Sequence, residues 1–265
     1  MAFPISLRLK TMHAEGKYIY CIIETKGQPQ QFGPIGIGGR GDEVYAICFD
    51  DMAAVVSNSP IKKYSVAREN LIFHECAIEE VMKTHVVLPV RFCTIAEGEN
   101  KVRKILEKEH DRFFSLLKDM EGKKELGLKA VFKEEAIYKE ILADYDEIRM
   151  EKEKMAKEPR SAHAHQKLMQ IGKMVEAALE EEKAKCKETI LSNLEPLALA
   201  VKTNNTYGER MILNAAFLVE KTKEAAFDMR VNELAEKYGD KMTFKYVGTL
   251  PPFNFVNIEI NTGDY

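Results

Sequence analysis

The feature that most constrains the fold lies near the end of the chain, at residues 243–260, which read TFKYVGTLPPFNFVNIEI. Two extended runs are predicted here, Thr243–Leu250 and Phe253–Ile260, joined at Pro251 and Pro252. Proline fixes φ and lacks an N–H donor, so this pair forbids a helix and interrupts a sheet. The second run forms an unusually apolar tail, and we expect it to be buried against its own domain or against another chain.

Length and composition predict two domains. The chain has 265 residues, close to the size at which single hydrophobic cores stop growing. Its 45% apolar and 31% charged residues are typical of a globular protein and exclude general disorder. The net charge of -3 and the pI of about 6.1 give no basic footprint, so nucleic acid is a poor candidate partner.

The distribution of apolar residues and cysteines predicts a cytosolic protein without a membrane partner. Residues 1–10 lack the apolar core of a signal peptide, and no later run reaches the ~18 apolar residues that a membrane span needs. The five cysteines are odd in number and contain no C-x-x-C, which argues against a disulfide framework and a zinc site. We expect all five to be buried free thiols.

The first part of the chain predicts strands around a glycine-rich loop. Lys17–Glu24 is rich in aromatic and β-branched residues, and Glu43–Phe49 with Met52–Ser57 reads as a hairpin. Between them, Gly36–Gly41 formally matches G-x-G-x-x-G. A dinucleotide site needs a helix directly after these glycines, and here a strand follows. A connecting or docking loop is therefore favoured over a phosphate site.

Helical spacing begins at Ser65, a plausible N-cap, and continues to about Lys83. Thr84–Thr94 reads as a strand whose Pro89 belongs at a sheet edge or a bulge, and an amphipathic helix follows to about Met120. Residues 1–121 are thus predicted to form an N-terminal α+β domain. Its small mixed or antiparallel sheet carries helices on one face.

The glycine-bounded segment Gly122–Gly127 predicts a domain boundary, and residues 122–265 are assigned to a second domain. The elements expected in it are a strand at Leu128–Phe132, a long helical hairpin inserted over about 133–201 with Ser161 as the N-cap of its second helix, a strand at Met211–Glu220, a helix at Lys223–Tyr238, the strand at Thr243–Leu250 and the apolar tail. This order is most of the split β-α-β plan called ferredoxin-like. The expected class is therefore two-domain α+β.

The sequence contains no residue pattern typical of a catalytic or metal-binding site. His74 with Glu75 begins a zincin-like motif, but the second histidine would stand at position 78, which is Ile78. His163 and His165 have no acidic or cysteine companions. Since no nucleophile and base, carboxylate pair or metal set is present, we predict no catalytic, cofactor-binding or metal-binding residues and no enzyme activity.

Three segments resemble the signature blocks of the gas vesicle protein F/L family. They are VLPVRFCT at 87–94, NAAFLV at 214–219 and YVGTLPPFNFV at 246–256. The similarity extends from Tyr18 to Val256. Departures from the family pattern are Cys93, where glycine is common, and the residues around the double proline, namely Thr249, Leu250, Phe253 and Asn254.

The resemblance implies a non-enzymatic part in building gas vesicles, as a minor structural component or assembly factor located at the gas vesicle within the cytoplasm. It implies the major shell protein as a partner and admits other gas vesicle accessory proteins as further partners. The residues that we expect to contact a partner are Arg40, Arg91, Pro251, Pro252, Phe253 and Phe255. The alternative is a ferredoxin-like small-molecule-binding regulatory protein, which a rise in melting temperature with a metabolite would favour.

Overall fold

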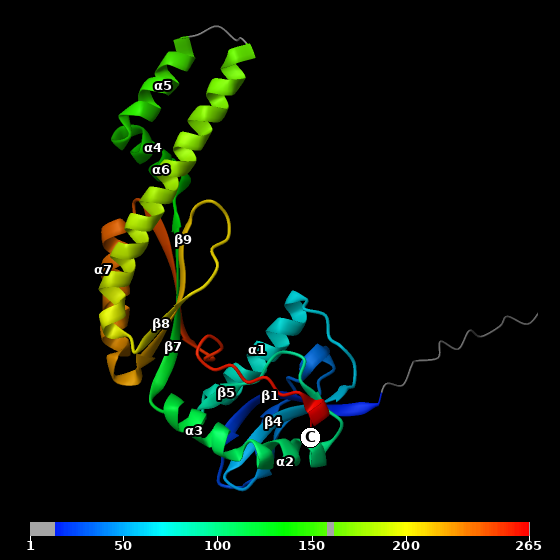
Figure 1. The fold of residues 1–265 in the computed structure, drawn as a ribbon. Helices are drawn as coiled ribbons and strands as arrows, with labels where there is room; N and C mark the ends of the chain where they lie inside the picture. Colours follow the sequence, from blue (N-terminus) through cyan, green and yellow to red (C-terminus); the bar gives the residue numbers. More distant parts are fainter. Residues whose placement is uncertain (1–13, 158–161, 265) are drawn as a thin grey trace, which may run out of the picture. The chain divides into compact units, whose positions relative to one another are not determined.

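The computed structural model describes residues 14–157 and 162–264, which form two compact units (Figure 1). Unit 1 comprises Met1–Glu121 together with Pro251–Tyr265, and unit 2 comprises Gly122–Leu250. The prediction of a second domain over 122–265 is therefore wrong at its end. The tail belongs to unit 1 because its contacts are made with that unit.

The sheet of unit 1 is built around β1 (Glu15–Glu24), whose residues favour extended structure. The order across the sheet is β2 (Gln31–Gly33), β3 (Val44–Phe49), β4 (Met52–Pro60), β1 and β5 (Val87–Pro89), with β6 (Ile95–Ala96) also paired to β1. All of these pairings are antiparallel. The predicted β3–β4 hairpin and the edge position of the strand that contains Pro89 are confirmed.

Helices cover both faces of this sheet, not one face as predicted (Figure 1). They are α1 (Arg68–Met82), α2 (Glu99–Lys108) and α3 (His110–Met120). Every residue of β1 from Tyr18 to Ile23 is buried. Successive strand residues point to opposite faces, so an unbroken buried run requires cover on both sides.

Three local predictions in unit 1 need correction. The N-cap of α1 is Ala67, while the backbone oxygen of Ser65 accepts a hydrogen bond from the Asn70 side-chain amide at 3.0 Å. The helix expected up to Met120 is two helices, α2 and α3, with a break at Glu109. The strand expected over 84–94 is reduced to the three residues of β5.

Unit 2 contains an antiparallel four-stranded sheet. Its order is β10 (Met242–Leu250), β7 (Lys123–Phe132), β9 (Met211–Glu220) and β8 (Ala200–Thr203). Numbered along the unit, these strands lie in the order 4-1-3-2, and all of their pairings are antiparallel. This is the ferredoxin-like topology that the sequence predicts.

The expected helical hairpin stands between β7 and β8. It consists of α4 (Glu134–Asp144), α5 (Asp146–Lys157) and α6 (Ala162–Leu194), and α7 (Glu224–Tyr238) connects β9 to β10. The predicted N-cap, Ser161, lies outside the described residues. The helical pattern predicted to reach Val201 ends at Leu194, because a 3-10 turn at Glu195–Leu197 and strand β8 follow. In the described part of the chain, no helix is long and apolar enough to span a membrane.

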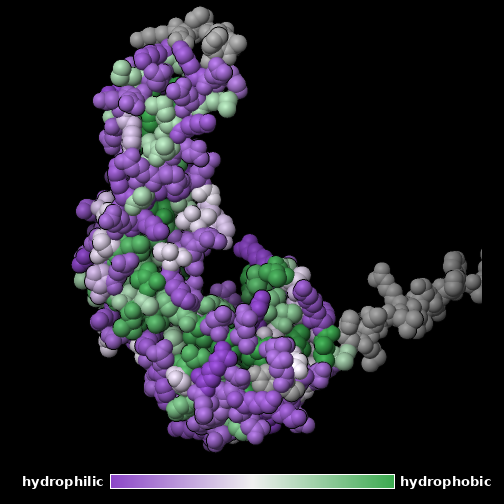
Figure 2. Space-filling view, in the orientation of Figure 1, coloured by the Kyte–Doolittle hydropathy of each residue, from purple (hydrophilic) through white to green (hydrophobic). Residues whose placement is uncertain are grey.

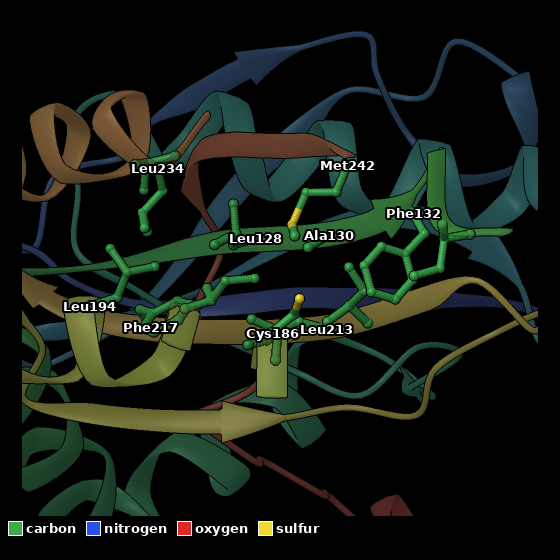
Figure 3. Packing of buried hydrophobic residues seen from close by; sticks show 14 of the residues in the cluster. Leu128, Ala130, Phe132, Cys186, Leu194, Leu213, Phe217, Leu234 and Met242 are labelled. Atoms are coloured by element: carbon green, nitrogen blue, oxygen red, sulfur yellow. The ribbon is translucent and has the colours of Figure 1, made fainter. Parts of the chain in front are cut away.

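The core of unit 2 follows the strand period of two. Alternate residues of β7 and β9 are buried on the same face, among them Leu128, Ala130 and Phe132 opposite Leu213 and Phe217. Figure 3 shows these side chains with those that the helices contribute. The contributors labelled there from α6 and α7 are Cys186, Leu194 and Leu234.

A half-buried ion cluster joins the hairpin to the sheet. The Lys241 ammonium donates to carboxylates of Glu140 on α4 and Glu182 on α6, with 3.2 Å between Lys241 Nζ and Glu182 Oε2. Burial opposes the charge of Glu182, yet hydrogen bonds from Lys185 and Lys241 hold its pKa below the ordinary value. The single lysine before β10 therefore compensates carboxylates from two helices.

The tail completes unit 1 from the far end of the sequence. Val256 and Ile258 are 4% and 1% exposed. Ile258 forms a parallel bridge with Val90, and the Arg91 N–H donates to the Ile258 carbonyl at 3.1 Å. The predicted extended run over 253–260 is wrong in its first half, where residues 253–255 form a turn.

Replacing Ile258 by alanine should selectively destabilise unit 1. Loss of a buried isoleucine side chain costs about 2–5 kcal/mol in the free energy of unfolding. Amide hydrogen exchange would show faster exchange in β1 and β5, while β7 and β9 keep their protection. The exposed neighbour Asn257, changed to alanine, is the matched control. Equal loss of protection in both units would contradict the assignment of the tail.

Replacing Lys241 by methionine should destabilise unit 2. The change leaves the carboxylate of Glu182, a residue only 8% exposed, without one of its compensating charges. We expect a loss of about 2 kcal/mol, less than for a fully buried pair. Urea unfolding followed by circular dichroism measures it. Lys245→Met, at an exposed position of β10, should change stability little.

Candidate functional site

The double proline places one aromatic ring at the surface of unit 1. Pro251 and Pro252 are buried, and the Val256 N–H donates to the Pro252 carbonyl at 2.8 Å, closing a turn. Phe253 lies at the tip of this turn and is 42% exposed, while Phe255 is half-buried. A turn fixed at both ends therefore presents the ring of Phe253 to solvent.

Phe253 rests on a histidine inside an aromatic cluster. Its ring centroid lies 6.1 Å from that of His74 on α1. The His74 ring is also 5.6 Å from Phe92 and stacks on Tyr20 at 5.8 Å. Contacts of this size between aromatic rings are favourable beyond the area that they bury. The cluster thus supports the buried side of the Phe253 ring.

His74 is held as a neutral imidazole. The Cys93 N–H donates to Tyr18 Oη at 2.9 Å, and the same hydroxyl forms a hydrogen bond with His74 Nδ1 at 3.1 Å. Burial lowers the pKa of His74 to about 4, and a backbone contact with Val90 offsets only part of this effect.

Apolar side chains are also exposed at the N-terminal end of the same helix. Val66, Leu71 and Ile72 are 77%, 38% and 45% exposed. Figure 2 shows hydrophobic atoms gathered at that end of α1. Together with Phe253 these residues define what we term the α1–tail surface. Exposed apolar side chains at one end of a helix are typical of an interaction site.

Arg91 anchors the tail. Its Nη1 lies 3.1 Å from Glu259 Oε1, and its backbone N–H bonds to Ile258. The ion pair is exposed and contributes little to stability. The structure therefore places Arg91 against the tail, where its contacts hold that segment in position.

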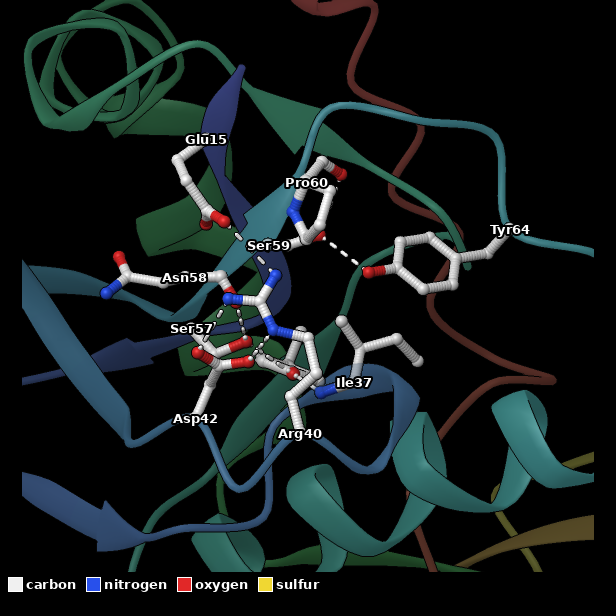
Figure 4. Close-up of polar contacts among 10 residues, drawn as sticks. Glu15, Ile37, Arg40, Asp42, Ser57, Asn58, Ser59, Pro60 and Tyr64 are labelled. Atoms are coloured by element: carbon white, nitrogen blue, oxygen red, sulfur yellow. Dashed lines mark hydrogen bonds and ion pairs between the residues drawn. The ribbon is translucent and has the colours of Figure 1, made fainter. Parts of the chain in front are cut away.

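Arg40 belongs to the glycine-rich loop. Its guanidinium lies between Glu15 of β1, at 3.2 Å, and Asp42 of the loop, at 3.0 Å (Figure 4). The loop is also tied to the sheet, since the Ile37 N–H donates to Tyr20 Oη at 2.7 Å. The Gly36 N–H is likewise used, donating to the Asp42 carbonyl at 2.9 Å. Amides bonded in this way do not form a cradle for phosphate.

Three glycines of this loop occupy conformations that favour glycine. Gly38, Gly39 and Gly41 have φ values of 79°, 67° and 75°. A Cβ at Gly39 would lie 3.1 Å from the ring of Phe73. The glycines thus serve close packing against α1, which agrees with the predicted connecting role. Cys93 has a φ of 68°, which explains physically why glycine suits that position.

One group in residues 14–157 and 162–264 has donor atoms spaced as in a metal site. Asp50, Asp51 and His110 carry ligand atoms within 4.8 Å of one another. His110 Nε2 already bonds Asp51 Oδ1 at 2.8 Å, which raises the pKa of His110. This contact joins the β3–β4 turn to the start of α3. Sequence reasoning missed it because no motif spacing links the turn to the helix.

The cysteines only partly follow the prediction. All five are free, and Cys21 and Cys186 are buried. Cys48 and Cys93 are half-buried, and Cys76 is exposed, so the expectation of burial is wrong for Cys76. Its position on the outer side of α1 explains the exposure, because helical spacing turns it away from Ala77 and Ile78.

His74 predicts a pH dependence of stability. In the unfolded chain it titrates near 6.5, and in the folded protein at about 4. The unfolded state therefore binds the proton first, and the free energy of unfolding should fall by about 3 kcal/mol as pH drops from about 6.5 to about 4. His74→Phe should flatten this part of the pH profile, measured by urea unfolding. The exposed His165→Gln in unit 2 should leave it unchanged, and an unaltered slope in His74→Phe would contradict the assignment.

Comparison with known proteins identifies relatives along most of the chain. The family model described as "Gas vesicle synthesis protein GvpL/GvpF" matches residues 16–257. Gas vesicle protein F of Dolichospermum flosaquae is 25% identical, over 82% of this chain and 88% of the relative. Gas vesicle protein F of Streptomyces sp. (strain CB03234) is 27% identical, over 90% and 98%.

Solved structures share the fold. The crystal structure of gas vesicle protein GvpF from Anabaena sp. PCC7120 matches with a TM-score of 0.75 and 24% identity, covering 93% of this chain and all of that one. GvpF from Microcystis aeruginosa matches with a TM-score of 0.69 and 22% identity, covering 91% and 98%. The α+β class is thereby confirmed. The family match spans more than nine-tenths of the sequence, and this chain belongs to the GvpL/GvpF family of gas vesicle proteins.

Proposed function

We propose that this chain is a non-enzymatic minor component or assembly factor that binds the major gas vesicle shell protein while the vesicle forms in the cytoplasm. Membership of the GvpL/GvpF family supports the gas vesicle role. The contact with the shell protein is our inference from the surface of unit 1. Other gas vesicle accessory proteins are the second class of partner that this role admits.

The observation that carries the proposal is the exposure of Phe253 on a rigid support. The ring is 42% exposed, although the prolines before it and Val256 after it are buried. An aromatic side chain held in place loses little conformational freedom when a partner covers it. Such a ring is therefore suited to anchor an apolar partner, as aromatic residues do at the centres of interfaces.

The other predicted contact residues have different parts in this proposal. Pro251 and Pro252 are buried and shape the turn, and Arg91 pairs with Glu259. These residues act by positioning the tail. The exposed side chains of Leu71 and Ile72 on α1 extend the apolar contact. The proposed contact is thus concentrated on the α1–tail surface, and Arg40 remains a candidate only as part of the glycine-rich loop.

Phe253→Ala should weaken binding to the shell protein. Truncating an anchoring aromatic residue costs about 2 kcal/mol or more, which is roughly a 30-fold loss of affinity. Co-purification of the intact chain with the major shell protein, followed by a binding titration, measures the effect. Tyr207→Ala in unit 2 removes an aromatic ring that is 73% exposed and is the matched control.

The outcomes separate the parts of the proposal. If the parent chain captures the shell protein and Phe253→Ala binds it equally well, the α1–tail surface is not the contact, but the shell protein remains the partner. No capture by the parent chain would overturn the shell protein as a partner. Deleting the tail is a poorer test, because it also removes the buried side chains of Val256 and Ile258.

A further inference from the structure

A groove of about 530 Å³ lies along α6 in unit 2. Its apolar lining consists of Tyr138 from α4 and of Leu168, Ile171, Val175 and Leu179 from α6. The α6 residues are spaced by three or four positions, so they form one stripe along the helix. From Leu168 to Leu179 the stripe is roughly 16 Å long, which is about three helical turns.

The groove offers only negative charge at its rim. Glu176, Glu180 and Glu209 line it, and no lysine or arginine does so among the described residues. Glu180 is paired with Lys183 at 2.7 Å. In the described part of the chain, no ion pair engages Glu176 or Glu209, and both are exposed. An apolar floor is thus edged by carboxylates that are available to a cationic partner.

Gly172 gives the floor of the groove room for close approach. It lies in the interior of α6, and a Cβ built there would have no atom within 4 Å. A glycine in a helix interior is destabilising relative to other residues, so the fold itself gains nothing from it. Without a side chain at this position, a second backbone can approach α6 closely.

We propose that this groove binds an amphipathic helix that carries lysine or arginine beside its apolar stripe. The length of the apolar stripe fits three turns of a helix, and the acidic rim selects a basic partner. The same carboxylates disfavour nucleic acid and acidic helices. This inference goes beyond the proposed function, because it concerns another unit and does not depend on the α1–tail surface.

The test uses the intact chain and two synthetic 18-residue helical peptides, one of leucine and lysine and one of leucine and glutamate. Fluorescence anisotropy measures their binding. The lysine peptide should bind and the glutamate peptide should not. The double variant Glu176→Lys and Glu209→Lys should lower the affinity for the lysine peptide by about tenfold, as expected for two exposed charge contacts. Glu188→Lys, on an exposed part of α6 away from the groove, is the matched control and should change binding little.

A second variant tests the groove without changing charge. Gly172→Met fills the open space over α6 and should abolish binding, while its melting temperature does not fall, because the glycine contributes nothing to packing. Phe253→Ala should bind the lysine peptide as the parent chain does. Absence of binding by the parent chain would overturn the proposal. So would equal weakening by Glu188→Lys, or undiminished binding by Gly172→Met, since either would indicate general attraction to an acidic protein.

Discussion

The return of the chain to unit 1 after β10 is the constraint on which the rest of the structure depends. The chain leaves unit 1 at Glu121 and re-enters it at Pro251, so unit 2 is an insertion between two parts of one unit. Ile258 is 1% exposed and pairs with Val90. Unit 1 therefore buries its full apolar surface only when the end of the chain is present, and this contact closes a very long loop. The tail cannot be treated as an appendage.

The buried and exposed parts of the tail divide two tasks. Val256 and Ile258 supply burial, which offsets the entropy lost in ordering the segment. Phe253 contributes less buried area and stays exposed to solvent, with its ring packed against that of His74. Because the neutral imidazole of His74 needs no counter-charge, the Phe253 ring packs against an uncharged aromatic surface. The stability of unit 1 and the exposure of Phe253 thus come from the same turn.

Local pattern in the sequence accounts for much of the fold, and long-range contacts account for the rest. Strand β9 follows from a short apolar run and the hairpin of β3 and β4 from apolar, β-branched runs, and the order of elements in unit 2 indicates the ferredoxin-like plan. Strand β8 was beyond reach, because four mostly exposed residues carry no periodic signal. The contact of His110 with Asp51 and the place of the tail were equally hidden, since each depends on which segments meet after folding. The exposure of Leu71 and Ile72 on α1 was also hidden, because helical spacing alone does not say which side of a broad apolar face is covered.

The two proposed surfaces use different physical chemistry, and this difference has a consequence for assembly. Contact at Phe253 depends on burial of apolar area, which salt affects little. Contact at the α6 groove depends partly on exposed carboxylates, and a Debye length of about 8 Å at physiological ionic strength screens such charges strongly. Ionic strength therefore weakens one contact and spares the other. Because the two proposed contacts lie on separately packed units and differ in their dependence on salt, an apolar partner at Phe253 and a basic helix at the α6 groove should dissociate independently of each other as ionic strength rises.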